Sequence, residues 1–446
     1  MPPDPRDWLA EDDLVYFVMD LVSALDLEPI YRKYDGSRGG RPPFSPQMMT
    51  GLLFYAYCVG VYSSRKIEQA TRDRISFRVL TGNQHPDHDT IADFRKRHLF
   101  ELAGYFTEVL LLCQKAGLVK LGHISLDGTK MRANASKHKA MSYGRMEKKA
   151  EELRREVEEL LEEARRTDEE EDDRHGKGRR GGELPDELKR REGRLEKIKE
   201  AMSALEEEAR EKAEEKRQEQ REKEAELQAS GRKRRGRKPK APSDKPESKS
   251  QRNFTDPESR IMKDGATKSF EQCYNCQAAV DQESQIVVAA TVTQEPNDKQ
   301  QVEPLIGELE SNLGEENLPG KASADSGYFS EANVNYLQSK GIDPYIATGR
   351  QKHGEPAPAA PRGRIPANLS TRERMARKLR TKKGKAIYKE RKQIVEPFFG
   401  QTKSARGFRQ FLLRGLENVG AEWSLLAMTH NLLKLFRSGR AAAVLN

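Results

Sequence analysis

Cysteine is scarce in this chain, with 4 in 446 residues, and tryptophan is scarcer still, with 2. So few cysteines exclude a disulfide-built fold and fit a reducing compartment. Cys273 and Cys276 form a CxxC, but in an expected strand this spacing sends the two side chains to opposite faces. A zinc site stays open, yet ordinary packing is favoured because no second CxxC or close histidine pair completes a tetrahedral site.

Long hydrophobic runs are also missing. The longest candidate, "LLFYAYCVGV", is shorter than the roughly 20 residues that a membrane span needs. The start, "MPPDPRDW", has no signal-peptide pattern. We therefore expect a cytoplasmic protein with no membrane partner.

Charged residues, in contrast, make up 34% of the chain, and 80 Lys+Arg against 71 Asp+Glu give a net charge of +9. The sequence pI near 9.1 favours an anionic polymer as partner, although a generic basic protein would have the same totals. The length allows two or three domains, while the mean hydropathy of −0.88 indicates that part of the chain lies outside any core.

Residues 1–117 are predicted to be all-helical. "SPQMMTGLLFYAYCVG" begins with Ser45 as a plausible N-cap and Pro46 at the first helical position. A short turn and the basic helix "SSRKIEQATRD" follow, as in helix-turn-helix DNA binding, but any small helical bundle has such turns. "HPDHDTIADF" contains metal-ligand types, yet the capping-box spacing of Thr90 and Asp93 favours a helix start.

Strands and helices alternate in residues 118–145 and 251–446, which predicts a mixed α/β domain. In "HISLDG" the period is two, so Asp127 is expected at a strand end, facing away from the apolar residues. "CYNCQAAVD" and "SQIVVAATVTQ" predict a hairpin, and "ADSGYF" again has an acid, Asp325, at a strand end.

Residues 146–250 interrupt this domain with a charged segment that has almost no aromatic residues. Its heptad-spaced apolar residues predict a coiled-coil-like antiparallel hairpin, although single solvated helices fit equally well because the apolar seam is thin. The insertion ends in a basic stretch that we expect to be disordered. Its "RRGRKP", with Arg234, Arg235 and Arg237, resembles an AT-hook core, but nonspecific phosphate binding is the safer expectation.

Three acids stand out as candidate catalytic residues: Asp127, Asp325 and Glu396. Mg²⁺ prefers oxygen ligands and binds through one or two carboxylates plus substrate phosphates. A pair of ions ~4 Å apart can activate the attacking oxygen and stabilise the leaving one in phosphodiester chemistry. Acids at strand ends also commonly cap helices and turns, and spacing alone leaves that alternative open.

Three blocks around these acids, "DGTKMRANASKHKAMSY", "ADSGYFSEANV" and "YKERKQIVEPFFGQTKSARGFRQF", resemble the acidic blocks of bacterial insertion-sequence DDE transposases with a Tyr-Arg-Glu-Lys signature. The amino-terminal "RPPFSPQMMTGLLFYAYCVGVYSSRKIE" resembles the helical domain that precedes their catalytic core. The resemblance implies a ribonuclease-H-like mixed sheet with flanking helices and two Mg²⁺ ions, for which Mn²⁺ can substitute. It places Asp127 on the first strand, Asp325 on the fourth and Glu396 on a helix behind the sheet.

The signature carries over to Tyr388, Arg391, Glu396 and Lys403, and the resemblance makes Tyr388, Arg391 and Lys403 candidate DNA contacts. The gap from Glu396 to Lys403 agrees with the family, but four residues separate Arg391 from Glu396 where the usual pattern has three. Either Arg391 or Lys392 therefore fills the arginine's part. Pro397 disfavours helix at the residue before it, so we expect Glu396 at a kink or a helix start.

The basic residues behind the first acid are candidate DNA contacts: Lys130, Arg132, Asn134 and Lys137. The only support for DNA contact by these residues is their proximity to Asp127 in the sequence. The alternative is that they form a solvated basic loop.

The expected partners are double-stranded DNA, as terminal inverted repeats and target, and a second copy of the chain in a synaptic homodimer, in a bacterial, nucleoid-associated setting. The leading hypothesis is a transposase that cleaves strands and transfers them with an Asp-Asp-Glu triad. A metal-dependent nuclease on the same fold and a catalytically inactive DNA-binding architectural protein are the alternatives.

Overall fold

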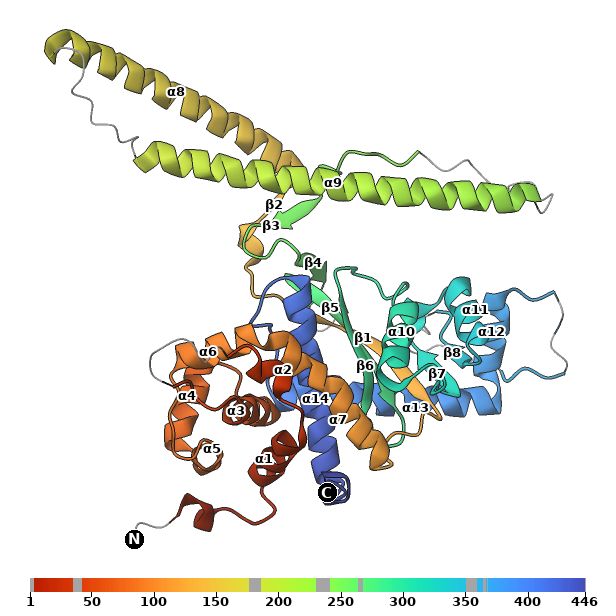
Figure 1. Cartoon of the computed structure of the whole chain (residues 1–446). Coiled ribbons are helices and arrows are strands. Elements are labelled where there is room, and N and C mark those ends of the chain that lie inside the picture. The colour runs from red at the N-terminus through yellow and green to blue at the C-terminus, as the bar shows by residue number, and fades with distance from the viewer. Residues whose placement is uncertain are drawn as a thin grey trace. The chain divides into compact units, whose positions relative to one another are not determined.

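The computed structural model describes residues 4–34, 42–175, 186–229, 241–263, 268–349, 359–363, 366 and 368–445. The chain divides into two compact units, one formed by Met1–Asn134 with Met262–Asn446 and the other by Ala135–Ile261. The helical amino-terminal segment and the sheet share the first unit (Figure 1). The domain boundaries expected at residues 117, 145 and 250 stay predictions. Within the described ranges no helix is long and apolar enough to cross a membrane.

The amino-terminal part of the first unit is helical, as predicted. Its elements are η1 (Pro5–Trp8), α1 (Leu14–Ala24), α2 (Glu28–Tyr31), α3 (Pro46–Cys58), α4 (Ser64–Asp73), α5 (Ile75–Leu80), α6 (His88–Arg97) and α7 (Leu99–Lys115). Ser45 caps α3 as predicted, by accepting a hydrogen bond from the Met48 N–H. The helix start near Thr90 is confirmed, but the cap is Asp87, whose carboxylate accepts the Thr90 N–H at 2.7 Å.

A mixed six-stranded sheet forms the other part of the first unit. Its hydrogen-bonded order is β4 (Arg260–Lys263), β5 (Phe270–Asp281), β1 (Ile124–Arg132), β7 (Lys321–Ala324) and β8 (Asp343–Ile346), with β6 (Val287–Thr293) also paired to β5. The β5–β6 hairpin that the sequence predicts is confirmed. β1 is antiparallel to β5 but parallel to β7, so the sheet is mixed, as predicted.

Asp127 does not lie at a strand end. β1 continues from Ile124 to Arg132 because all nine residues pair with β5, so Asp127, Lys130 and Arg132 all belong to the strand. The pairing with β7 is shorter and its last pair is Leu126 with Ala324. Asp127 is therefore the first residue of β1 beyond its parallel neighbour, and this edge of the strand is open there.

The next elements of the first unit flank this sheet (Figure 1): α10 (Val302–Leu313), η3 (Ser326–Tyr328), α11 (Glu331–Ser339), α12 (Thr371–Arg380), α13 (Lys382–Gly400), the π-helical η4 (Gln401–Ala405) and α14 (Leu416–Arg437). The last helix, α15 (Ala442–Leu445), contacts α1 and α7. The helix α14 is buried along most of its length and contacts α7, α3 and β6. The Phe398 ring of α13 packs between Trp423 and His430 of α14, with ring centroids 5.3 and 5.0 Å apart. This packing fixes the carboxyl-terminal part of α13.

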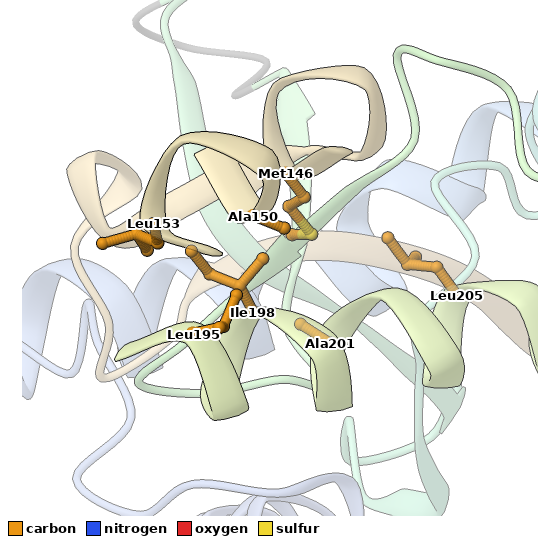
Figure 2. Packing of buried hydrophobic residues seen from close by; sticks show 7 residues of the cluster. All are labelled: Met146, Ala150, Leu153, Leu195, Ile198, Ala201 and Leu205. Atoms are coloured by element: carbon orange, nitrogen blue, oxygen red, sulfur yellow. The ribbon is translucent and has the colours of Figure 1, made fainter. Parts of the chain in front are cut away.

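The second unit contains two long helices, α8 (Tyr143–His175) and α9 (Asp186–Ala229), with η2 (Lys137–Lys139) and the antiparallel strands β2 (Ala140–Ser142) and β3 (Gln251–Asn253). Tyr143 bonds to Glu206 while Arg191 pairs with Glu156, so the helices run antiparallel. Figure 2 shows the apolar cluster between them, formed by Met146, Ala150, Leu153, Leu195, Ile198, Ala201 and Leu205. The structure therefore contains a helical insertion. That its two helices form a coiled coil stays a prediction.

Candidate active site

Two of the three predicted acids lie at the same level of neighbouring parallel strands. Asp127 follows Leu126 in β1 and Asp325 follows Ala324 after β7, and Leu126 and Ala324 are register partners. Each acid is oriented by the backbone that follows it. Asp127 Oδ1 accepts the Gly128 N–H at 2.9 Å, and Asp325 Oδ1 accepts the Gly327 N–H at 2.7 Å.

The helix α13 supplies a cation to the first acid. Arg391 Nη1 donates to Asp127 Oδ2 at 3.0 Å, and the two side chains are only 11% and 21% exposed. The Arg391 guanidinium carbon lies 5.9 Å from the centroid of the Tyr388 ring. Burial raises the pKa of the Tyr388 phenol, the Arg391 guanidinium lowers it, and the Asp325 and Asp127 carboxylates raise it further. The third signature block therefore contacts the first acid directly, through Arg391.

The electrostatics of Asp127 are set mainly by its burial. Loss of solvent raises the pKa of Asp127 to about 6, and the charge of Asp325 acts in the same direction. The Arg391 guanidinium and the Gly128 N–H lower the pKa but do not cancel the effect of burial. A second cation at this edge would favour the charged form of Asp127.

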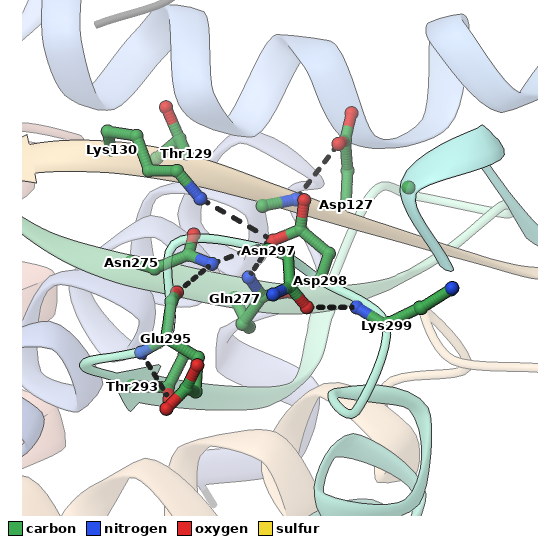
Figure 3. A network of polar contacts seen from close by, with 12 residues as sticks. Asp127, Thr129, Lys130, Asn275, Gln277, Thr293, Glu295, Asn297, Asp298 and Lys299 are labelled. Atoms are coloured by element: carbon green, nitrogen blue, oxygen red, sulfur yellow. Dashed lines mark hydrogen bonds and ion pairs between the residues drawn. The ribbon is translucent and has the colours of Figure 1, made fainter. Parts of the chain in front are cut away.

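A fourth acid, Asp298, lies at this edge and was missed by the sequence analysis (Figure 3). Its Oδ1 accepts hydrogen bonds of 2.7 Å from Asn275 Nδ2 and from Gln277 Nε2, both on β5. Lys130 Nζ lies 3.7 Å from the same oxygen. In sequence Asp298 is one acid in the polar connection "QEPNDKQQ", and nothing there distinguishes it from a turn residue.

Glycines allow Asp298 to approach both catalytic candidates. A Cβ on Gly128 would lie 2.9 Å from Asp298 Oδ1, and a Cβ on Gly327 would lie 3.3 Å from Asp298 Oδ2. Gln277 connects the same parts, because its side chain donates to Asp298 and accepts the hydroxyl hydrogen of Tyr328, which follows Gly327. The glycine after each acid is the sequence feature that could have indicated this close packing.

Glu396, the third predicted acid, is exposed on α13. Glu396 is not at a helix start, one of the two expected positions, because α13 continues through Pro397 to Gly400, and a kink at Pro397 stays a prediction. Pro397 cannot donate to the Gln393 carbonyl, and the Gln285 side chain donates to that carbonyl instead, at 2.8 Å. The helix therefore passes its proline with the freed acceptor satisfied.

Lys403, the last signature residue, lies in the π-helical η4 and contacts β1. Its ammonium donates to Thr129 Oγ1 at 2.6 Å and to the Lys130 carbonyl at 2.7 Å. Because η4 is not α-helical, spacing from Glu396 does not predict the direction of Lys403.

The basic residues after Asp127 do not form one strand-end loop. Lys130 is mostly buried against Asp298, and Arg132 is exposed at the end of β1. The Asn134 amide donates to the Leu412 carbonyl at 2.7 Å, and Lys137 belongs to the second unit. Three further predicted contacts lie outside the described residues: Arg234, Arg235 and Arg237.

The donor set at this edge suits a hard divalent cation in part. Asp127 and Asp325 offer carboxylate oxygens, and one or two carboxylates with substrate phosphate are the usual protein share of a Mg²⁺ site. Among the residues that the structure describes, no group of three or more His, Cys, Asp or Glu side chains is arranged to hold a metal. Glu396 thus does not complete a three-acid ligand set in this conformation.

Two family models match the chain. Residues 4–97 match the model described as "Transposase domain (DUF772)", and residues 240–432 match the model described as "Transposase DDE domain". The second match includes Asp325 and Glu396. No curated protein and no solved structure matches the chain.

A DDE domain defines an enzyme of DNA cleavage and joining, and it implies a ribonuclease-H-like fold, in agreement with the mixed sheet and its flanking helices. The chain belongs to the DDE transposases of insertion sequences, which confirms the resemblance seen in the sequence. Enzymes of this class generally use divalent metal ions.

Proposed function

We propose that the protein binds the terminal inverted repeats of its element as a homodimer, hydrolyses a strand at each end and joins the freed 3′ hydroxyl to target DNA. The observation that carries this proposal is the register of β1 and β7, since it brings Asp127 and Asp325 to one open edge of the sheet. The match of residues 240–432 to a transposase DDE domain supports it independently.

In this proposal Asp127, Asp325 and Glu396 are the catalytic triad and the ligands of the divalent ions, with Mg²⁺ as the working metal. The bound metal would supply activation of the attacking oxygen and stabilisation of the leaving one. The chain's own cations orient the acids. Arg391 fixes the rotamer of Asp127, and Lys403 anchors the end of the third block to β1.

The Arg391–Asp127 pair favours Arg391 over Lys392 as the signature arginine. Lys392 is exposed on the other side of α13, whereas Arg391 is buried against the first acid. Tyr388, which neighbours Arg391, would line the same site.

DNA binding by the other parts of the chain belongs to the same proposal. The helical segment 1–117 would contact the element ends through its basic helix α4, which begins after the short turn that follows α3. The insertion would continue as a coiled coil and grip flanking or target DNA through residues 231–240. Deleting those residues should lower affinity for DNA and flatten its salt dependence, and unchanged binding would contradict this role.

The proposal is tested by incubating the protein with duplexes that carry the element's own ends and a separate target duplex. Nicked ends and products joined to the target should form with Mg²⁺ or Mn²⁺ and not with a chelator. Cleavage without any joined product would show a nuclease, and neither product would show a protein that only binds DNA.

A further inference from the structure

One face of α13 carries a row of lysines that the site described above does not use. Lys382, Lys385, Lys389 and Lys392 follow one another at spacings of three, four and three residues. At 3.6 residues per turn these positions fall within an arc of about 80°. Glu396 is the next position of the same row, four residues beyond Lys392, and all five side chains are exposed.

The opposite face of α13 is buried against the protein. The buried residues of this helix include Gly384, Arg391, Ile394, Val395 and Phe398. Arg391 points from that face to Asp127. The lysine row therefore lies on the solvent side of the helix that delivers both Arg391 and Glu396.

Other basic residues nearby have structural partners. On α12, Arg372 donates to the Thr348 carbonyl at 2.8 Å, Arg377 donates to the Gly363 carbonyl at 2.8 Å, and Lys378 pairs with Asp343. The four lysines of the row differ, because within the part of the chain that the structure describes none of their side chains has a hydrogen bond or an ion pair.

The four lysine charges destabilise α13 when no anion is bound to them. Like charges three and four residues apart repel each other along a helix, and cations near a helix amino terminus oppose its dipole. Lys382 and Lys385 lie in the first turns of α13. Of the two acids on the helix, Glu396 only ends the row, and Glu390 lies on another face, where it accepts from Gln282 at 3.1 Å. An anionic partner would remove both penalties.

We propose that this lysine row binds the phosphate backbone of double-stranded DNA and leads it along α13 to Glu396. The ten-residue interval from Lys382 to Lys392 is about 15 Å long. The same length of duplex carries roughly four phosphates on each strand, so four lysines match one strand. The inference rests on the proposed function, because the duplex bound by the lysine row is taken to be the DNA that the enzyme cuts.

Neutralising two lysines of the row tests the binding with a matched control. The test variant is Lys385→Gln with Lys389→Gln, and the control is Lys115→Gln with Lys340→Gln, which removes the same charge elsewhere. The affinity for a synthetic duplex of arbitrary sequence is measured over a range of salt concentrations. The slope of log affinity against log salt should fall by about 1.8 in the test variant, since each phosphate contact contributes about 0.9.

The control and the charge-preserving Lys385→Arg with Lys389→Arg variant should keep the slope of the unaltered protein. An unchanged slope in the glutamine variant, or an equal fall in the control, would overturn the inference. If the unaltered protein cuts element ends but the glutamine variant keeps its slope, only the role of the lysine row is refuted. Unaltered protein that binds no duplex refutes the proposed function as well.

A cross-linking measurement locates the DNA directly. The four native cysteines are free and buried, so a single surface cysteine can be labelled selectively. A photo-reactive probe at Lys389→Cys should cross-link the bound duplex, whereas the same probe at Lys115→Cys should not. Cross-linking from Lys389→Cys only to a second copy of the chain, or to nothing, would contradict the proposal.

Discussion

Arg391 donates a 3.0 Å hydrogen bond from Nη1 to Oδ2 of Asp127, across 264 positions of sequence. The contact joins the third signature block to the first and ties α13 to the central strand of the sheet. It also means that one oxygen of the first acid already has a cationic partner. The position of this guanidinium therefore decides how Asp127 faces its proposed metal and substrate.

Arg391→Gln should impair both stability and activity, whereas Lys392→Gln should impair stability little. Removing the hydrogen-bond partner of a largely buried carboxylate is expected to cost about 2 kcal/mol of unfolding free energy. Misplacement of Asp127 should lower kcat/KM for cleavage roughly a hundredfold. An exposed lysine should change stability by less than about 0.5 kcal/mol. Urea unfolding and cleavage kinetics measure both, and a larger fall of kcat at saturating DNA in Lys392→Gln than in Arg391→Gln would assign the signature arginine's part to Lys392.

Asp298→Asn tests the acid that lies close to Gly128 and Gly327, the glycines that follow the two candidate acids. In one of its two orientations the new amide would point its own N–H group at the amide donors of Asn275 and Gln277, so those hydrogen bonds would be lost. The substitution also removes the negative charge near Lys130. We expect kcat for cleavage to fall by roughly tenfold or more, as for other residues that orient metal ligands, with KM little changed. Glu283→Gln, at an exposed acid paired with Lys120, is the control. A change in KM alone would show that Asp298 acts in binding instead.

Gln285 and Pro397 should be energetically coupled. Gln285→Ala leaves the Gln393 carbonyl without its side-chain donor, which should cost about 1 kcal/mol. With Pro397→Ala as background, the alanine N–H can bond to that carbonyl, so the same Gln285→Ala change should cost less. A double-mutant cycle from urea unfolding measures the coupling. Equal costs in both backgrounds would show that Gln285 does not compensate for the proline.

His430 makes the fold sensitive to acid. Burial lowers the pKa of His430 to about 3, from 6.5, while its ring contacts the Gln285 carbonyl at 2.9 Å. The unfolded chain takes up a proton below pH 6.5 and the folded chain does not, so stability falls as pH drops from 6.5 toward 3. Between pH 7 and 5 this one histidine should remove ~2 kcal/mol. His430→Gln should show a correspondingly smaller loss, and parallel pH profiles would refute the assignment.

The sequence predicted elements where the pattern is local. The Ser45 cap, the β5–β6 hairpin and the strand-acid-turn around Asp325 depend on neighbouring residues, and all are present. The prediction that the strand ends at Asp127 was wrong, because the length of β1 is set by pairing with β5, whose partner residues lie far away in sequence.

The sequence indicated Asp127, Asp325 and Arg391, whose strands and contact the structure brings together, but it did not indicate Asp298. Asp298 was missed because its role comes from amides on β5 and from two glycines, which sequence spacing does not connect to it. The helix through Pro397 was missed for the same reason, since Gln285 satisfies the freed carbonyl from a distant hairpin turn. Long-range polar contacts thus override local preference at both places.

Glu396→Gln gives the most direct test of the triad, because Glu396 is the acid that is exposed on α13 and outside any three-acid metal set among the described residues. The measurement is Mg²⁺-dependent cleavage and joining of the element's ends, alongside binding of the same duplex, with Asp127→Asn and Asp325→Asn for comparison. The account predicts that all three variants bind the duplex like the unaltered protein and form neither product. Cleavage by Glu396→Gln at the rate of the unaltered protein would contradict the Asp-Asp-Glu assignment.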